Sequence, residues 1–265
     1  MGQLREKLHR VVAETLIEVG REHRLLALLR ERENKRLKDR LGNEVLYGPL
    51  AGFKLISESQ WGAADHPLKV LGLYEQPVQA VLSALAPLNR LFCLGAADGF
   101  FGVGSVAAGL AQRSLNWEMV EESRRIMADT ATANGVADRI RTFGIAESDF
   151  ISQSGEEAPG ADDVVLIDIE GAEYDILTDE TLNALSATHV IIELHPFLVE
   201  NGAAREQLLL EKAASVFDVE MIEDTVRDLS GIAELRELSD DARWLACSEA
   251  RERQMRWAHF RPRKV

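Results

Sequence analysis

The sequence has little cysteine and no long apolar run. Its 265 residues include two cysteines, Cys93 and Cys247, which are too few for a disulfide framework or a cysteine-rich zinc site. No segment reaches the roughly 18–20 apolar residues that a membrane-spanning helix needs. The charged first residues lack the apolar stretch of a secretory signal. These absences predict a cytoplasmic protein that has no membrane partner.

The sequence also lacks the usual phosphate-binding signatures. It contains no G-x-x-x-x-G-K-[S/T] loop, and in the segment G-A-A-D-G (95–99) Ala97 stands where a dinucleotide fingerprint has its second glycine. That glycine lets the backbone approach a pyrophosphate closely. The turn therefore favours a ligand that has an adenosine but no phosphates.

Positive charge is scarce in the middle of the chain. Residues 1–41 hold 11 bases and 7 acids, and residues 251–265 hold 6 bases and 1 acid. Residues 42–250 therefore hold 13 bases and 36 acids, within a net charge of −14. An acidic body repels polyanions, so we expect no nucleic-acid partner. The C-terminal arginines are interpreted as a basic tail that lies across the acidic body or a partner subunit.

The chain divides into two predicted parts, of which residues 1–88 are an N-terminal helical segment with loops. Leucines and valines recur at helical spacing within residues 3–41, and residues 42–75 interleave aromatics with glycines, as binding loops do. We expect the N-terminal helix either to pack on its own domain or to form a homodimer with a second copy. In the loops, Trp61, Tyr74 and Glu75 are candidates for ligand contact.

The second part, residues 89–265, alternates short apolar strands with helices of about a dozen residues. Strands are expected at 91–94, 115–118, 140–143, 163–169, 189–194, 219–222 and 243–248, and helices at 102–112, 121–134, 173–185 and 203–216. This alternation predicts an α/β fold with a Rossmann-like, doubly wound, mostly parallel sheet covered by helices on both faces. In such sheets, ligands bind beyond the carboxyl ends of the strands.

The residues after the first two predicted strands are typical of adenosine binding. Gly95, Ala96, Asp98 and Gly99 belong to a glycine-rich turn between a strand and a helix, where a ligand can approach the backbone. Glu118 ends the second strand, at a place where an acid accepts hydrogen bonds from ribose hydroxyls.

Acids and one histidine follow two later strands. Asp168 and Glu170 alternate along an extended segment, and His195 comes two residues after Glu193. Acids at the edge of an apolar strand are costly unless they are solvated, hydrogen-bonded or paired with a cation. Imidazole is the usual general base near neutral pH, although a lone histidine is more often structural. These four residues are candidates for binding and catalysis.

Together, these segments resemble the FkbM-type S-adenosylmethionine-dependent methyltransferases. The resemblance covers about residues 90–250 and is most specific in I-D-I-E-G-A-E-Y-D-I-L (167–177), followed by V-I-I-E-L-H-P (190–196). It implies a seven-stranded class I methyltransferase sheet whose last strand is antiparallel. It also implies S-adenosylmethionine as the cofactor and methyl transfer to an oxygen of a small molecule, sugar or natural product. Cys93 departs from the family pattern, which often has an aspartate at that position.

The resemblance and the strand-end positions together assign roles within the site. The cofactor is expected to contact Gly95, Ala96, Asp98, Gly99, Glu118, Ala146, Glu147, Asp168, Tyr74 and Glu75. The small-molecule acceptor is expected near Trp61 and Glu170, with His195, Asp168 and Glu193 as the groups that would remove its hydroxyl proton. No residue is assigned as a metal ligand, although a divalent cation is an alternative way to neutralise the acidic cluster.

Two other functions stay open. A nicotinamide-dependent oxidoreductase uses the same combination of adenosine and acid, but it predicts a complete G-x-G-x-x-G turn, which Ala97 interrupts. A non-catalytic S-adenosylmethionine-binding member of the family would act by assembly through the N-terminal helix. The N/D-P-P-Y/F motif of many DNA base methyltransferases does not occur in the sequence.

Overall fold

The computed structural model describes residues 10–11, 22–56, 65–223, 227–249, 251 and 253–263. Within these ranges, no helix is long and apolar enough to cross a membrane. The predicted N-terminal helix is present as α2 (Glu22–Leu41). The remainder of its predicted range, apart from residues 10 and 11, lies outside the described residues, and so does Trp61.

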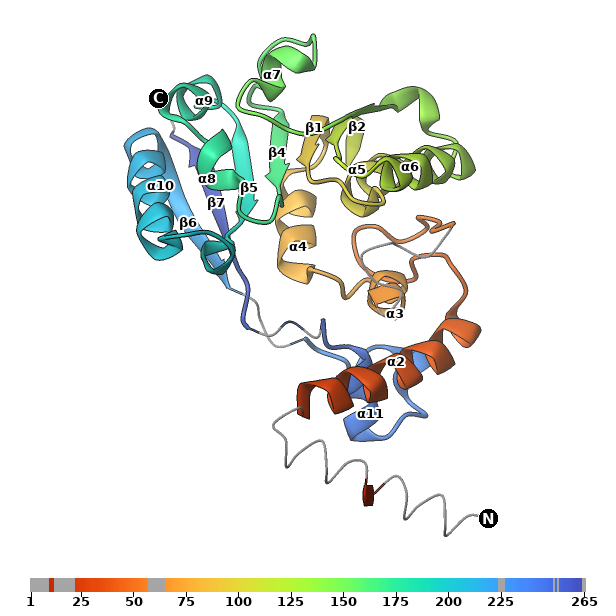
Figure 1. Cartoon of the computed structure of the whole chain (residues 1–265). Helices are drawn as coiled ribbons and strands as arrows, with labels where there is room; N and C mark the ends of the chain where they lie inside the picture. The colour runs from red at the N-terminus through yellow and green to blue at the C-terminus, as the bar shows by residue number, and fades with distance from the viewer. Residues whose placement is uncertain are drawn as a thin grey trace.

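A seven-stranded sheet forms the centre of the molecule (Figure 1). Its strands are β1 (Leu88–Leu94), β2 (Ala111–Trp117), β3 (Ile140–Phe143), β4 (Asp163–Ile167), β5 (His189–Glu193), β6 (Phe217–Glu223) and β7 (Arg256–Pro262). They lie in the order β3-β2-β1-β4-β5-β7-β6, and β7 alone runs antiparallel to its neighbours. The predicted doubly wound, mostly parallel sheet is confirmed. Its strand order reverses between β1 and β4, which is where such sheets bind ligands.

Helices cover both faces of the sheet because buried side chains alternate along its strands. In β1, Leu91 and Cys93 belong to one core, and Phe92 and Leu94 belong to the other. The first core is completed by helices α4 (Gln76–Leu85), α5 (Phe100–Ala107) and α6 (Glu121–Ala133). The second core is completed by helices α7 (Phe150–Gln153), α8 (Glu173–Ile176), α9 (Asp179–Ala184) and α10 (Gly202–Val216).

The N-terminal part packs against a late segment of the chain. Helix α2 lies beside α11 (Asp240–Ala246), and α3 (His66–Val70) lies between α2 and the sheet (Figure 1). Arg30 of α2 donates hydrogen bonds to the carbonyl of Ser248 and to the carboxylate of Asp65. Leu37 belongs to the same core as Val103 in α5. The boundary at residue 88 stays a prediction, and the side chains on its two sides share one core.

Three predictions for the second half of the chain are wrong in detail. Residues 243–248, predicted as a strand, lie mainly in helix α11, because the Ser239 hydroxyl accepts a hydrogen bond from the Ala242 amide at its N-terminus. The final strand is instead β7, so the C-terminal segment is a sheet strand and not a tail. The predicted helix 173–185 is two short helices, since Thr178 caps a new helix at α9.

The arginines of the C-terminal segment nevertheless contact the acidic body, as expected. Arg256 pairs with Glu206, and Arg261 pairs with Glu220. The other predicted strands and helices of residues 89–265 are present, with ends that shift by a few residues.

Candidate functional site

The glycine-rich turn lies between β1 and α5, beside the end of β4. Gly95 has a φ of 81°, and a Cβ on it would lie 1.7 Å from the carbonyl oxygen of Asp168. Only glycine fits there, because it tolerates both the positive φ and the contact between the two backbones. Gly99 also has a positive φ, and a Cβ there would lie 2.7 Å from Met127 of α6. The two glycines thus fix the turn against β4 and α6.

Glu118 follows β2 and reaches the same turn. One of its carboxylate oxygens accepts a hydrogen bond from the Ala97 amide at 2.9 Å, and the other accepts from the Val120 amide at 2.7 Å. The side chain is buried, and Glu118 and Ala97 line a common cavity. The sequence prediction that the turn and this acid belong to one site is therefore consistent with their positions.

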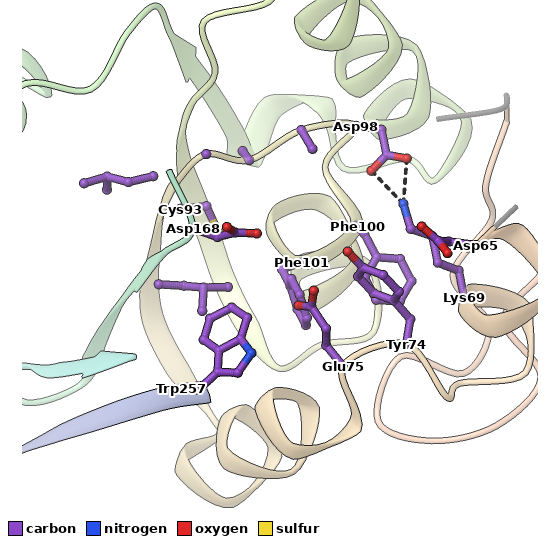
Figure 2. Close-up of a pocket in the computed structure, with 15 residues that line it drawn as sticks. Asp65, Lys69, Tyr74, Glu75, Cys93, Asp98, Phe100, Phe101, Asp168 and Trp257 are labelled. Atoms are coloured by element: carbon purple, nitrogen blue, oxygen red, sulfur yellow. Dashed lines mark hydrogen bonds and ion pairs between the residues drawn. The ribbon is translucent and has the colours of Figure 1, made fainter. Parts of the chain in front are cut away.

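A cavity open to solvent, with about 780 Å³ of space, lies at the carboxyl ends of the strands. Its wall contains seven carboxylates (Asp65, Glu75, Glu118, Asp168, Glu170, Glu193 and Glu249) and one arginine, Arg251. A connected hollow reaches inward to Cys93, Phe101 and Trp257. Figure 2 shows Glu75 and Asp168 facing this space from opposite walls. The excess of acids in this wall favours a positively charged ligand.

Asp168, Glu170, Glu193 and His195 are brought together as the sequence predicts. The Nε2 atom of His195 lies 3.6 Å from Asp168 Oδ1, 3.6 Å from Glu170 Oε2 and 3.5 Å from Glu193 Oε2. The imidazole and the Glu193 side chain are each only 2% exposed. One imidazole therefore faces three carboxylates at distances longer than an ordinary hydrogen bond.

Glu173, the last acid of the D-I-E-G-A-E segment, has a structural role. Its side chain is completely buried and accepts hydrogen bonds from the amides of Gly171 and His195. These bonds join the loop after β4 to the end of β5, and Glu173 also lies 3.3 Å from the Nδ1 atom of His195. Glu173 thereby fixes the backbone at His195, whose Nε2 atom lies near Asp168, Glu170 and Glu193.

Arg251 is a site residue that the sequence analysis did not identify. Its guanidinium donates hydrogen bonds to Glu75, Glu193 and Glu249, and so connects three acids of the cavity wall. Glu249 in turn accepts a hydrogen bond from the amide of Glu75. No local pattern in the sequence indicates this arrangement, because Arg251 reaches the site from the segment that connects α11 to β7.

Burial of these groups shifts their pKa values. Burial, reinforced by Asp168, raises the pKa of Glu75 to about 8 despite the opposing effect of Arg251. Burial and the neighbouring Glu193 raise the pKa of Asp168 well above its usual value, and burial also raises that of Glu193. For His195, burial lowers the pKa, but Glu173, Glu193 and Asp168 outweigh it and raise the pKa to about 10. At neutral pH, His195 therefore holds a proton.

Backbone strain concentrates in the cavity wall. Glu75, Ala97 and Glu170 all line the cavity, and they have positive φ values of 46°, 47° and 52°. Among the described non-glycine residues only one other, Asn201, has a positive φ. Such conformations are unfavourable by about 1–3 kcal/mol each and cluster at functional sites. Their clustering supports a functional role for this cavity.

The remaining predicted site residues differ in how they relate to the cavity. Tyr74 and Ala96 line it, and so does Asp98, but the carboxylate of Asp98 is held by Lys69 at 2.9 Å (Figure 2). Ala146 is half-buried against the second core and Glu147 is exposed, and neither lines the cavity.

Similarity to known proteins was found at the level of the fold. No protein-family model matches the sequence, and no curated protein matches it. A solved structure described as the METTL16 MTase domain has a TM-score of 0.50 and 13% sequence identity, over 89% of this chain and 80% of that one. An O-methyltransferase from Bacillus cereus in complex with SAH has a TM-score of 0.47 and 13% identity, over 71% and 80% of the two chains. With its strand order and antiparallel β7, this chain has the seven-stranded α/β fold of the class I methyltransferases.

Proposed function

We propose that the protein is an S-adenosylmethionine-dependent methyltransferase of the FkbM type, which methylates a hydroxyl of a small molecule. The main supporting observation is the hydrogen bond between the Ala97 amide and Glu118 at the edge of an acidic cavity. It joins an adenosine-binding turn after β1 to a ribose-binding acid after β2, next to the point between β1 and β4 where the strand order reverses.

The chemistry of the cavity favours this cofactor over a dinucleotide. The sulfonium of S-adenosylmethionine is positively charged, whereas a nicotinamide dinucleotide has two phosphates. The cavity wall offers seven carboxylates and one arginine. Ala97 also occupies the place of the glycine that a pyrophosphate needs. Both features favour a cation without phosphates.

In the proposed complex, the glycine-rich turn and the neighbouring residues each contact a different part of the cofactor. Glu118 would accept hydrogen bonds from the ribose hydroxyls, while Gly95 and Ala96 would lie along the methionine and ribose. Ala146 and Glu147, after β3, would lie near the adenine. Glu75 and Asp168 would face the positively charged part of the cofactor across the hollow that Figure 2 shows.

Methyl transfer requires the acceptor oxygen to lie in line with the methyl group and the sulfur. The oxygen forms a bond to the methyl carbon, the carbon–sulfur bond breaks, and the hydroxyl proton passes to a base. The products are S-adenosylhomocysteine and a methyl ether. His195 holds a proton at neutral pH, since its pKa is about 10, so a carboxylate beside it is the better acceptor. Asp168 and Glu193, whose pKa values are raised, are suited to this role.

The proposal is tested by titrating the full chain with labelled S-adenosylmethionine and, separately, with NAD. We expect saturable binding of the first only. Glu118→Gln should weaken S-adenosylmethionine binding about 10–100-fold, because it removes a charged acceptor of hydrogen bonds. Glu121→Gln, in the first turn of α6, is the matched control and should bind as the unaltered protein does. NAD binding without S-adenosylmethionine binding would overturn the proposal.

A further inference from the structure

The cluster of Asp168, Glu193 and His195 has the composition of a metal site. Each residue offers one ligand atom, and these atoms all lie within 4.8 Å of one another. The three residues come from the ends of two adjacent parallel strands, β4 and β5, so the pairing of those strands fixes their spacing. Two carboxylates and one imidazole are ordinary ligands of divalent first-row metals.

The distances in this cluster are longer than those of ordinary hydrogen bonds, and they suit a shared cation. Ligand atoms about 2.0–2.2 Å from one metal ion lie roughly 3.0–3.5 Å from each other in octahedral or tetrahedral geometry. The Nε2 atom of His195 lies 3.6 Å from Asp168 Oδ1 and 3.5 Å from Glu193 Oε2. Small movements of the side chains would bring all three atoms to a common metal.

Two buried atoms of the cluster have unsatisfied hydrogen-bonding capacity. Asp168 Oδ1 and His195 Nδ1 are both buried and have no hydrogen-bond partner of acceptable geometry among the described residues. The His195 ring is 98% buried, and Glu173 fixes the adjacent backbone by accepting a hydrogen bond from its amide. A buried polar group without a partner is unfavourable by about 1–3 kcal/mol, so the unsatisfied Asp168 oxygen, 3.6 Å from the Nε2 atom of His195, is suited to accept a cation.

We infer that Asp168, Glu193 and His195 bind a divalent cation of the Mg²⁺/Mn²⁺ class at the edge of the cavity. On binding, the metal replaces the proton on Nε2, since only the neutral ring is a ligand. Glu170 is 61% exposed and lies 3.6 Å from the same nitrogen, so it is available as a fourth ligand. Arg251 holds the other oxygen of Glu193, which leaves Oε2 directed at the cluster.

The cation would have open positions toward the cavity, where an oxygen of the acceptor can bind. A metal-bound hydroxyl would have a lower pKa and lose its proton more easily. With Asp168 and Glu193 held on the metal, the proton would pass to Glu75, which faces the same space from the opposite wall. This role rests on the proposed function and narrows the acceptor class to compounds whose reacting hydroxyl can bind a metal. The binding of the cation itself does not depend on methyl transfer.

The test is a titration of chelator-treated full-length protein with Mn²⁺, without S-adenosylmethionine, in which electron paramagnetic resonance measures the free ion. We expect one saturable site. Asp168→Asn and Glu193→Gln should each weaken binding by at least about tenfold, because each removes one charged ligand. Two controls should bind Mn²⁺ as the unaltered protein does. Asp179→Asn removes a carboxylate of α9 that pairs with Lys212 away from the cavity, and His259→Gln removes a buried histidine of β7.

A second measurement detects the His195 ligand directly, even in a variant that still binds Mn²⁺. The electron spin echo of bound Mn²⁺ should show coupling to an imidazole nitrogen, and this coupling should disappear in His195→Gln. Absence of saturable binding up to about 1 mM Mn²⁺, equal weakening in the Asp179→Asn control, or a bound ion without nitrogen coupling would each overturn the inference. If Mn²⁺ binds as expected but S-adenosylmethionine does not, the proposed function fails and the metal site stands.

Discussion

The two ends of β4 both hold buried charge, and only the amino end pairs it completely. There, Asp163 and Arg90 lie opposite each other in β4 and β1, and their side chains form a two-pronged ion pair with a shortest distance of 2.6 Å. The guanidinium also donates to the carbonyls of Glu157 and Ala158. At the carboxyl end, Asp168 keeps a buried oxygen without a hydrogen bond, and acids surround it.

This difference separates charges that stabilise the fold from charges that are kept for a ligand. At the amino end, each buried group has a fixed partner within the protein, and the pKa of Arg90 is raised by its hydrogen bonds to Asp163. At the carboxyl end, the pKa values of Glu75, Asp168 and Glu193 are raised by burial, and the nearby backbone is strained. We therefore expect a bound ligand to stabilise the carboxyl end, whereas the groups at the amino end are paired within the protein.

The largest expected effect is at the amino end. Asp163→Asn leaves the buried Arg90 with only the more distant carboxylate of Glu156, at 3.6 Å, and we expect a loss of about 3 kcal/mol in the free energy of unfolding. Denaturant unfolding measures this loss. The matched control is Arg125→Met, which breaks an exposed pair with Glu122 on α6 and should lose less than about 1 kcal/mol. Equal losses in the two variants would mean that the amino end is not stabilised by its buried pair.

The residues at the carboxyl end of the sheet could be predicted from the sequence, because the apolar runs show where the strands end. The apolar runs of β4 and β5 locate Asp168, Glu193 and His195 at one edge of the sheet, and the glycine-rich turn locates Glu118 beside it. These inferences need only the rule that parallel strands present their carboxyl ends together.

The contributions from loops could not be predicted. Arg251, Glu249 and Asp65 enter the cavity because α2 packs against α11, and that packing depends on contacts between residues more than 200 positions apart. The prediction of a strand at 243–248 failed for a related reason. A short run with apolar residues is compatible with either a helix or a strand. Here the Ser239 cap and the acids of the first turn stabilise a helix. The strand β7 is flanked by arginines, which made it resemble a surface tail.

The second expected effect is a pH dependence of cofactor binding at the carboxyl end. The pKa of Glu75 is about 8, so this carboxyl is mostly protonated at pH 6 and ionised at pH 9. S-Adenosylmethionine has one positive charge more than S-adenosylhomocysteine, so the ionised carboxylate of Glu75 attracts it more strongly. We expect its affinity to rise at least about tenfold, or about 1.4 kcal/mol, between pH 6 and pH 9.

Isothermal titration calorimetry at the two pH values measures this change. S-Adenosylhomocysteine is the matched control ligand, and its affinity should change less because its sulfur is uncharged. In Glu75→Gln the difference between the two ligands should shrink. Identical pH profiles for the two ligands in the unaltered protein would show that Glu75 does not face the charged sulfur.

The smallest expected effect has the opposite sign to the first. Asp168→Asn is the same substitution as Asp163→Asn, five positions further along the chain, but it removes a half-buried carboxylate that lies beside other acids. In the presence of a chelator we expect the free energy of unfolding to rise by about 0.5–1 kcal/mol, as is typical when a functional site gives up an unfavourable charge. A loss comparable to that of Asp163→Asn would instead show that Asp168 stabilises the fold.

When the free energy of unfolding is measured again with Mn²⁺, the unaltered protein should become more stable than Asp168→Asn. A ligand that binds only the folded state stabilises it in proportion to the logarithm of its concentration over its dissociation constant. The unaltered protein should therefore gain about 2.7 kcal/mol at a hundredfold excess of Mn²⁺ over that constant. Asp168→Asn should gain much less. The carboxylate that weakens the fold without the metal would then be the one that strengthens it when the metal is bound, which is the behaviour expected of a charge kept for a ligand.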